Sequence, residues 1–105
     1  MAMLKVATLL TPRASRMPVT VKTRFVCGGA PVDVTVINVT VYGFMAEAER
    51  EVRAGEAGIL CLPWGEELKA EVRWAQGTRF GAEFVPAIRT FTLAQILSLY
   101  ETDAR

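Results

Sequence analysis

This 105-residue sequence contains no histidine, the side chain that most often serves as a general base or a metal ligand. Only two cysteines occur, Cys27 and Cys61, without CxxC spacing. Both lie in apolar runs, so we expect two buried, reduced thiols in a cytoplasmic protein. No stretch approaches the roughly 20 apolar residues of a membrane-spanning helix, so we expect no membrane insertion.

Acidic residues are missing from the first third of the chain. Residues 1–32 hold five basic residues and no acid, whereas residues 33–105 hold seven basic residues and all eleven acids. The net charge is only +1, which argues against general polyanion binding by the whole molecule. The segregation predicts that an anionic ligand is drawn to the N-terminal third, although chance gives the same pattern in a small protein.

The acids are also scattered, with no spacing that builds a catalytic dyad. Without histidine, activation of a nucleophile would need a lysine or a carboxylate pair. We therefore expect no enzymatic activity, no bound metal and no cofactor. With 51% apolar and 22% charged residues, the composition is that of one folded domain.

Alternating β-branched residues predict a first strand, Val19 to Val26, with Lys22 and Arg24 on one face. The pair Gly28-Gly29 predicts a tight turn into a second strand. The second to sixth strands are expected at residues 32–40, 43–47, 58–62, 68–74 and 79–85, with a charged irregular segment at 47–56.

After Pro86 the apolar period becomes helical as far as Tyr100, with Thr90 or Thr92 as the expected cap. Six short strands and one helix predict a mainly β fold, a small six-stranded antiparallel barrel with a C-terminal α-helix. The expected organisation is a single domain over residues 1–105. It comprises a basic arm (1–18), the barrel (19–86) and the helix with its tail (87–105).

Three groups of residues stand out in this order along the chain. They are Arg13 with Arg16, then Asn38-x-Thr40-x-x-Gly43, then Val72-Arg73-Trp74 followed by Gly77 and Phe80-Gly81-Ala82-Glu83-Phe84. Their order and separation resemble those of PilZ domains, bacterial receptors for the signalling dinucleotide cyclic di-GMP, over roughly residues 12–100. The resemblance implies a PilZ-like split barrel.

The ligand signature of that family is RxxxR before the first strand and [D/N]xSxxG between the second and third. Asn38 and Gly43 fit the second part, and Thr40 keeps the hydroxyl of the serine. Arg16 takes the place of the second arginine, but Pro12 stands where the first belongs. The other arginine is Arg13, so the first part reads RxxR.

The resemblance implies ligand contacts from Arg13, Arg16, Asn38, Thr40 and Gly43. Arginine donates paired hydrogen bonds to phosphate or to guanine, and asparagine offers a donor and an acceptor to a base edge. A hydroxyl donates to phosphate, and glycine allows close approach of the backbone.

The shifted arginine is compatible with a clamp on the ligand. Thr11 suits a helix N-cap and Pro12 the first helical position. One helical turn there would bring Arg13 and Arg16 onto a common face.

Each of these residues also has a structural interpretation. Arg13 and Arg16 fit a solvated basic arm, Asn38 a turn cap, and Thr40 an ordinary β-branched strand residue. Trp74, Phe80 and Phe84 alternate with polar neighbours and are predicted to lie in the core. Trp64, beside Gly65 in a turn, is predicted to be exposed and to belong to an interaction surface.

Three functions remain open. The first is a standalone PilZ adaptor that binds cyclic di-GMP and relays it to an unidentified protein partner, as a monomer or homodimer. The second is a degenerate PilZ-like domain that does not bind the dinucleotide and acts through protein–protein interaction. The third is an unrelated nucleic-acid-binding barrel. It ranks last because the aromatic residues fall mainly in predicted core positions, so we expect no DNA or RNA partner.

Overall fold

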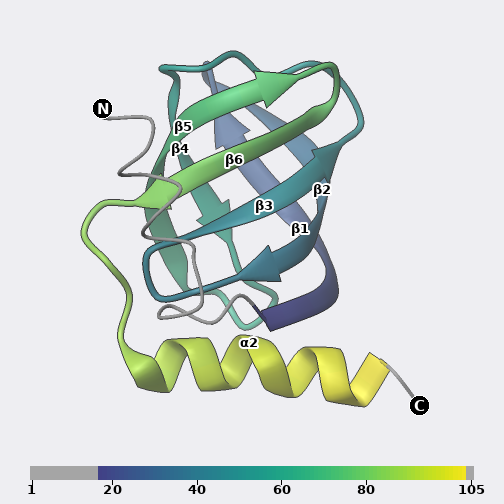
Figure 1. Ribbon diagram of the computed structural model, residues 1–105, viewed down its shortest axis with the longest axis vertical. Helices are drawn as coiled ribbons and strands as arrows, with labels where there is room; N and C mark the ends of the chain where they lie inside the picture. Colours follow the sequence, from purple (N-terminus) through teal and green to yellow (C-terminus); the bar gives the residue numbers. More distant parts are fainter. Residues whose placement is uncertain (1–16, 104–105) are drawn as a thin grey trace.

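The computed structural model describes residues 17–103, in which six strands form a closed antiparallel barrel (Figure 1). The strands are β1 (Met17–Cys27), β2 (Ala30–Val39), β3 (Gly43–Ala48), β4 (Ala57–Cys61), β5 (Glu67–Gln76) and β6 (Arg79–Phe84). Their order around the barrel is β1-β2-β3-β6-β5-β4, and β4 pairs back onto β1. The predicted fold class is confirmed.

The tight turn between β1 and β2 forms at the predicted glycine pair. Gly28 and Gly29 have φ angles of 62° and 79°, in the left-handed region that glycine enters without a steric penalty. Cys27 and Ala30 flank the turn as the last pair of the β1–β2 register. The two-residue turn therefore sets which side chains of the two strands share a face.

The barrel interior is built around four phenylalanines. Phe25 and Phe80 are completely buried, with ring centroids 5.4 Å apart. Phe44 packs edge-on against Phe80 at 5.8 Å and tilted against Phe84 at 5.4 Å. Aliphatic side chains from all six strands complete this core. The predicted core positions of Phe80 and Phe84 are confirmed.

The helix α2 (Thr90–Asp103) lies across one end of the barrel (Figure 1). Ile96 on α2 is buried as part of the core. The backbone N–H of Leu93 donates to the carbonyl of Arg89 at 3.0 Å, so Arg89 occupies the N-cap position. The prediction of a Thr90 or Thr92 cap is wrong, because the chain leaving β6 enters the helix earlier and Thr92 is buried against the barrel.

Across residues 17–103, no helix has the length and apolar character needed to cross a membrane.

Both cysteines are free, as predicted, but they differ in burial. Cys27 lies in the core, and burial is the main cause that raises the pKa of its thiol, with the nearby Glu56 carboxylate adding to the effect. Cys61, the last residue of β4, is only half-buried. The prediction of two buried thiols therefore holds for Cys27 alone.

Candidate functional site

Thr40 organises the short loop that joins β2 to β3. Its side chain is 1% exposed, and its Oγ1 accepts hydrogen bonds from the backbone N–H groups of Tyr42 (2.9 Å) and Gly43 (3.2 Å). The backbone N–H of Thr40 in turn donates to the carbonyl of Gly43 at 2.8 Å. The hydroxyl oxygen therefore serves the loop itself, as short polar side chains often do in turns.

Gly43 is needed where β3 approaches β6. A Cβ atom at this position would lie 2.2 Å from the backbone carbonyl oxygen of Ala82, far inside any normal contact distance. A backbone oxygen cannot move aside as a flexible side chain can. The packing of the two strands thus accounts for this glycine without reference to a ligand.

Asn38 lies at an irregularity of β2 and faces the outside of the barrel. The register with β3 shifts between Val36 and Asn38, a β-bulge. The next residue, Val39, is buried, whereas Asn38 is half-buried. The Cα partners of Asn38 are Pro18 on β1 and Met45 on β3.

Asn38 belongs to a row of residues that runs across five strands. Pro18 pairs with Asn38, Asn38 with Met45, Met45 with Gly81, and Gly81 with Trp74. Residues directly opposite each other in a sheet share a face. We call this set, Pro18, Asn38, Met45, Gly81 and Trp74, the outer row.

The prediction that Trp74 lies in the core is wrong, and a second β-bulge is the reason. The β5–β6 register shifts between Val72 and Trp74, which reverses the alternation of β5. Val72 is buried and Ala75 packs against the core, so Trp74 is turned outward and half-buried.

The indole of Trp74 lies on the backbone of β6. A Cβ atom at Gly81 would fall 2.2 Å from the indole Nε1 and 2.6 Å from Cε2. Phe80 and Ala82, on either side of Gly81, are both buried, so Gly81 faces outward. A glycine inside an otherwise regular strand is a sequence signal of such close approach at Gly81, but the register was needed to show that Trp74 is the residue that approaches.

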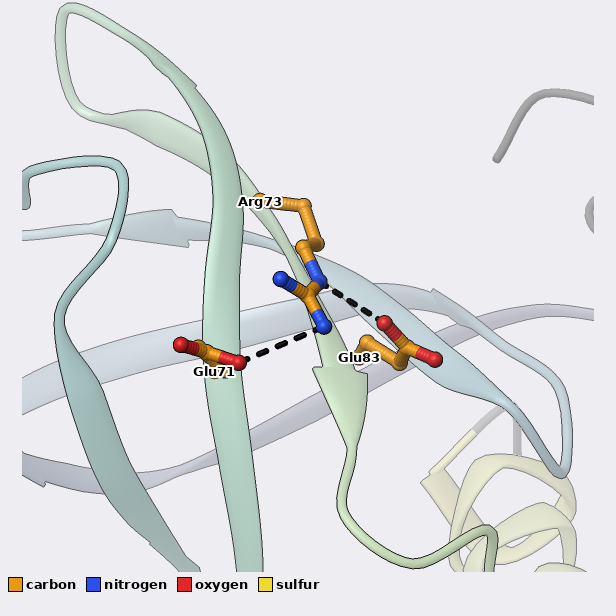
Figure 2. A network of polar contacts seen from close by, with 3 residues as sticks. All are labelled: Glu71, Arg73 and Glu83. Carbon is orange, nitrogen blue, oxygen red and sulfur yellow. Dashed lines mark hydrogen bonds and ion pairs between the residues drawn. The ribbon is translucent and has the colours of Figure 1, made fainter. Parts of the chain in front are cut away.

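Ion pairs border the outer row on both sides. Figure 2 shows Arg73 between Glu71 and Glu83, with N–O distances of 3.2 Å and 2.7 Å. On the other side Arg79 Nε lies 3.0 Å from Glu47 Oε1. The positive charges of these two arginines are therefore engaged by carboxylates.

Glu47 is the carboxylate in these ion pairs whose pKa is clearly shifted. The hydroxyl of Thr78 donates to it, and this bond, followed by that from Arg79, lowers the pKa of Glu47. Glu47 thus stays ionised to a lower pH than an unperturbed glutamate does. The opposite charges of Glu47 and Arg79 cancel, so this border of the outer row carries no net charge.

The first part of the sequence motif leads directly into the outer row. Arg13 and Arg16, and the helical turn predicted at Thr11 and Pro12, lie outside the described residues. Met17, which follows Arg16 in the chain, pairs with Val39, and Pro18 is the first member of the row. The described part thus places Asn38 beside Met45 and sets Trp74 two strands further along the same row, while Thr40 and Gly43 shape the adjoining loop.

Within residues 17–103, no group of three or more acidic or cysteine side chains is arranged to hold a metal ion. Comparison of the chain with protein-family models, with curated proteins and with solved structures found no match. The outer row and the residues that lead into it are therefore the features of this chain that bear on its function.

Thr40→Val is expected to destabilise the protein by about 1–3 kcal/mol, because two backbone N–H groups lose their acceptor in a closed loop. Thr40→Ser keeps the oxygen and should retain most of the stability. Urea unfolding followed by circular dichroism measures both. Equal losses in the two variants would show that the methyl group, not the hydroxyl, is what the loop requires.

Proposed function

We propose that this protein binds cyclic di-GMP as a standalone cytoplasmic adaptor and relays the signal to a partner protein. The observation that carries the proposal is the outer row. It combines a half-exposed indole at Trp74, a thioether at Met45 and the amide of Asn38. Its first member, Pro18, follows Arg16 by two positions in the chain.

The chemistry of the row suits a purine ring. Stacking of a base on an aromatic side chain is worth roughly 1–3 kcal/mol and needs a flat, partly exposed ring. The Asn38 amide supplies one donor group and one acceptor to a guanine edge. In this proposal Trp74 on β5 contacts the face of one guanine. Asn38 lies three strands away on β2, so it reads the edge of the second guanine or orients an arginine.

The two phosphates of the ligand need positive charge from another part of the chain. Arg73 and Arg79 border the row, but both are paired with glutamates. The residues that remain for the phosphates are those of the basic N-terminal third, above all Arg13 and Arg16. Bidentate arginine contacts to phosphate are among the stronger hydrogen bonds in proteins.

Backbone hydrogen bonds offer a route from this site to α2. The carbonyl of Tyr42 accepts from the N–H of Phe84 at 2.7 Å, and the carbonyl of Val41 accepts from the N–H of Ile88 at 2.8 Å. The loop that follows Asn38 is thus tied to the segment that leads into α2. A ligand that shifts the loop would change the surface that this segment presents to a partner.

A degenerate domain that acts only through protein contacts is the second candidate. It is favoured by the roles of Thr40 and Gly43, which the loop and the strand packing explain without a ligand. In that case the outer row is a surface for a protein, and the dinucleotide has no effect on the molecule.

Calorimetric titration with cyclic di-GMP tests the proposal. The wild-type chain is expected to show saturable binding in the low micromolar range. Arg16→Ala should weaken it about 10- to 100-fold, the effect of losing one charge-assisted hydrogen bond of roughly 1.5–3 kcal/mol. Arg50→Ala, an exposed arginine beyond the end of β3 and away from the outer row, is the control and should bind as the wild type does.

The contribution of Trp74 can be measured separately by fluorescence. The chain has two tryptophans, so a Trp64→Phe background isolates the Trp74 emission, which should change on ligand addition. Gly81→Ala in that background displaces the indole without removing it and should weaken binding. A folded wild-type protein with no heat of binding and no fluorescence change would favour the degenerate domain.

A further inference from the structure

A second surface, away from the outer row, lies at the start of α2. Phe91, in the first turn of the helix, is 71% exposed, and Val85 is 48% exposed. They flank an open groove of about 620 Å³ between the beginning of β5 and the segment 85–89. Leu68, Pro86 and Ile88 supply apolar parts of its lining.

The groove carries charges of both signs in equal number. Glu66 and Glu67 line it together with Lys69 and Arg89. Glu66 accepts a hydrogen bond from the indole of Trp64 at 3.1 Å. Among the described residues, Glu67, Lys69 and Arg89 have no ion-pair partner, so their charges are available to another molecule.

We propose that this surface binds a second copy of the chain and forms a two-fold symmetric homodimer. A two-fold interface places the same patch on both subunits, so the patch must be complementary to itself. The patch at the start of α2 has an exposed ring, Phe91, beside a groove that could receive it. It also has two acidic residues beside two basic ones. Phe91 of one copy enters the groove of the other, while Glu67 faces Lys69 across the interface in both directions.

The size of the surface sets the expected strength. A standard interface buries about 800 Å² on each partner, about an eighth of the 6455 Å² exposed by this chain. The lining comes from two short segments, 66–69 and 85–89, and the first turns of α2, so the contact belongs at the low end of the range. The dimer should therefore be weak, with association in the micromolar range, and it does not depend on cyclic di-GMP.

Sedimentation velocity of the full chain without ligand tests the proposal. The wild type should pass from monomer to dimer as its concentration rises from low to high micromolar. Phe91→Ser should remain monomeric over the same range. Because Phe91 is largely exposed, thermal unfolding of the variant at low micromolar concentration, where both proteins are monomers, should match that of the wild type and show that the variant is folded.

Charge reversals give a more specific test. Lys69→Glu and Glu67→Lys should each remain monomeric, because each places like charges across the two-fold axis. Mixing the two variants should restore a dimer, since both cross-axis pairs are then of opposite sign. Lys22→Glu makes the same charge change on the exposed face of β1 and should dimerise as the wild type does.

Two results would overturn the proposal. One is a wild-type chain that stays monomeric at every concentration, which leaves the groove to a different protein or to the N-terminal residues of the same chain. The other is a dimer that persists in Phe91→Ser, or charge variants that do not combine when mixed.

Discussion

Gly43→Ala is expected to destabilise the protein by about 3 kcal/mol, the upper end of the usual penalty for overpacking. The added methyl group would lie 2.2 Å from the carbonyl oxygen of Ala82. Relief requires β3 and β6 to separate, and this would break the pairing of Phe44 with Ala82. Chemical denaturation monitored by tryptophan fluorescence measures the loss.

Gly29→Ala is the matched control for this substitution. Its new methyl group would meet no atom within 4 Å, so only the positive φ of 79° opposes it. An L-residue in that region costs about 1 kcal/mol. If Gly43→Ala proved no more damaging than Gly29→Ala, the close approach of β3 to Ala82 would not be what requires the glycine.

This prediction also bears on the ligand site. Gly43 belongs to the motif that resembles a cyclic di-GMP signature, yet its replacement should displace β3 and the adjoining loop whether or not Gly43 touches the ligand. Variants of Gly43 are therefore poor probes of ligand contact. Substitutions of Arg16 and displacement of Trp74 through Gly81→Ala test the site more directly.

Phe80→Ala is expected to have the largest effect on stability, a loss of about 3–5 kcal/mol. Phe80 is completely buried and its ring lies 5.4 Å from that of Phe25 and 5.8 Å from that of Phe44. Removing it leaves a cavity that the closed barrel cannot easily collapse. Since a native domain is stable by only about 5–15 kcal/mol, this change takes a large share of the total.

Phe91→Ala is the control because it removes the same side chain from an exposed position. At low micromolar concentration, where the proposed dimer is absent, its effect should stay within about 0.5 kcal/mol. Thermal and urea unfolding of both variants provide the comparison. A Phe80→Ala protein that lost less than Phe91→Ala would contradict the assignment of Phe80 to the core.

The sequence pattern predicted all six strands, mostly because a strand that buries one face alternates apolar and polar residues. The fourth strand was predicted instead from a short apolar run that ends at Pro63. Lys22 and Arg24 are exposed, and Phe80 and Phe84 are buried, as their spacing indicated. Trp74 was assigned to the wrong face. A bulge inserts one residue without changing the local composition, so alternation continued across it gives the wrong answer for every residue that follows.

The sequence by itself determined the strand number, the Gly28-Gly29 turn, most of the core and the free cysteines, because these follow from local pattern and composition. The tertiary structure decided what depends on register between distant strands. It brought Asn38, Met45, Gly81 and Trp74 into one outer row, engaged Thr40 within its loop, and set Gly43 against Ala82. The physical reason is that three register shifts, in β1, β2 and β5, and the closure of the barrel choose which residues meet, and none of these has a repeating pattern in the chain.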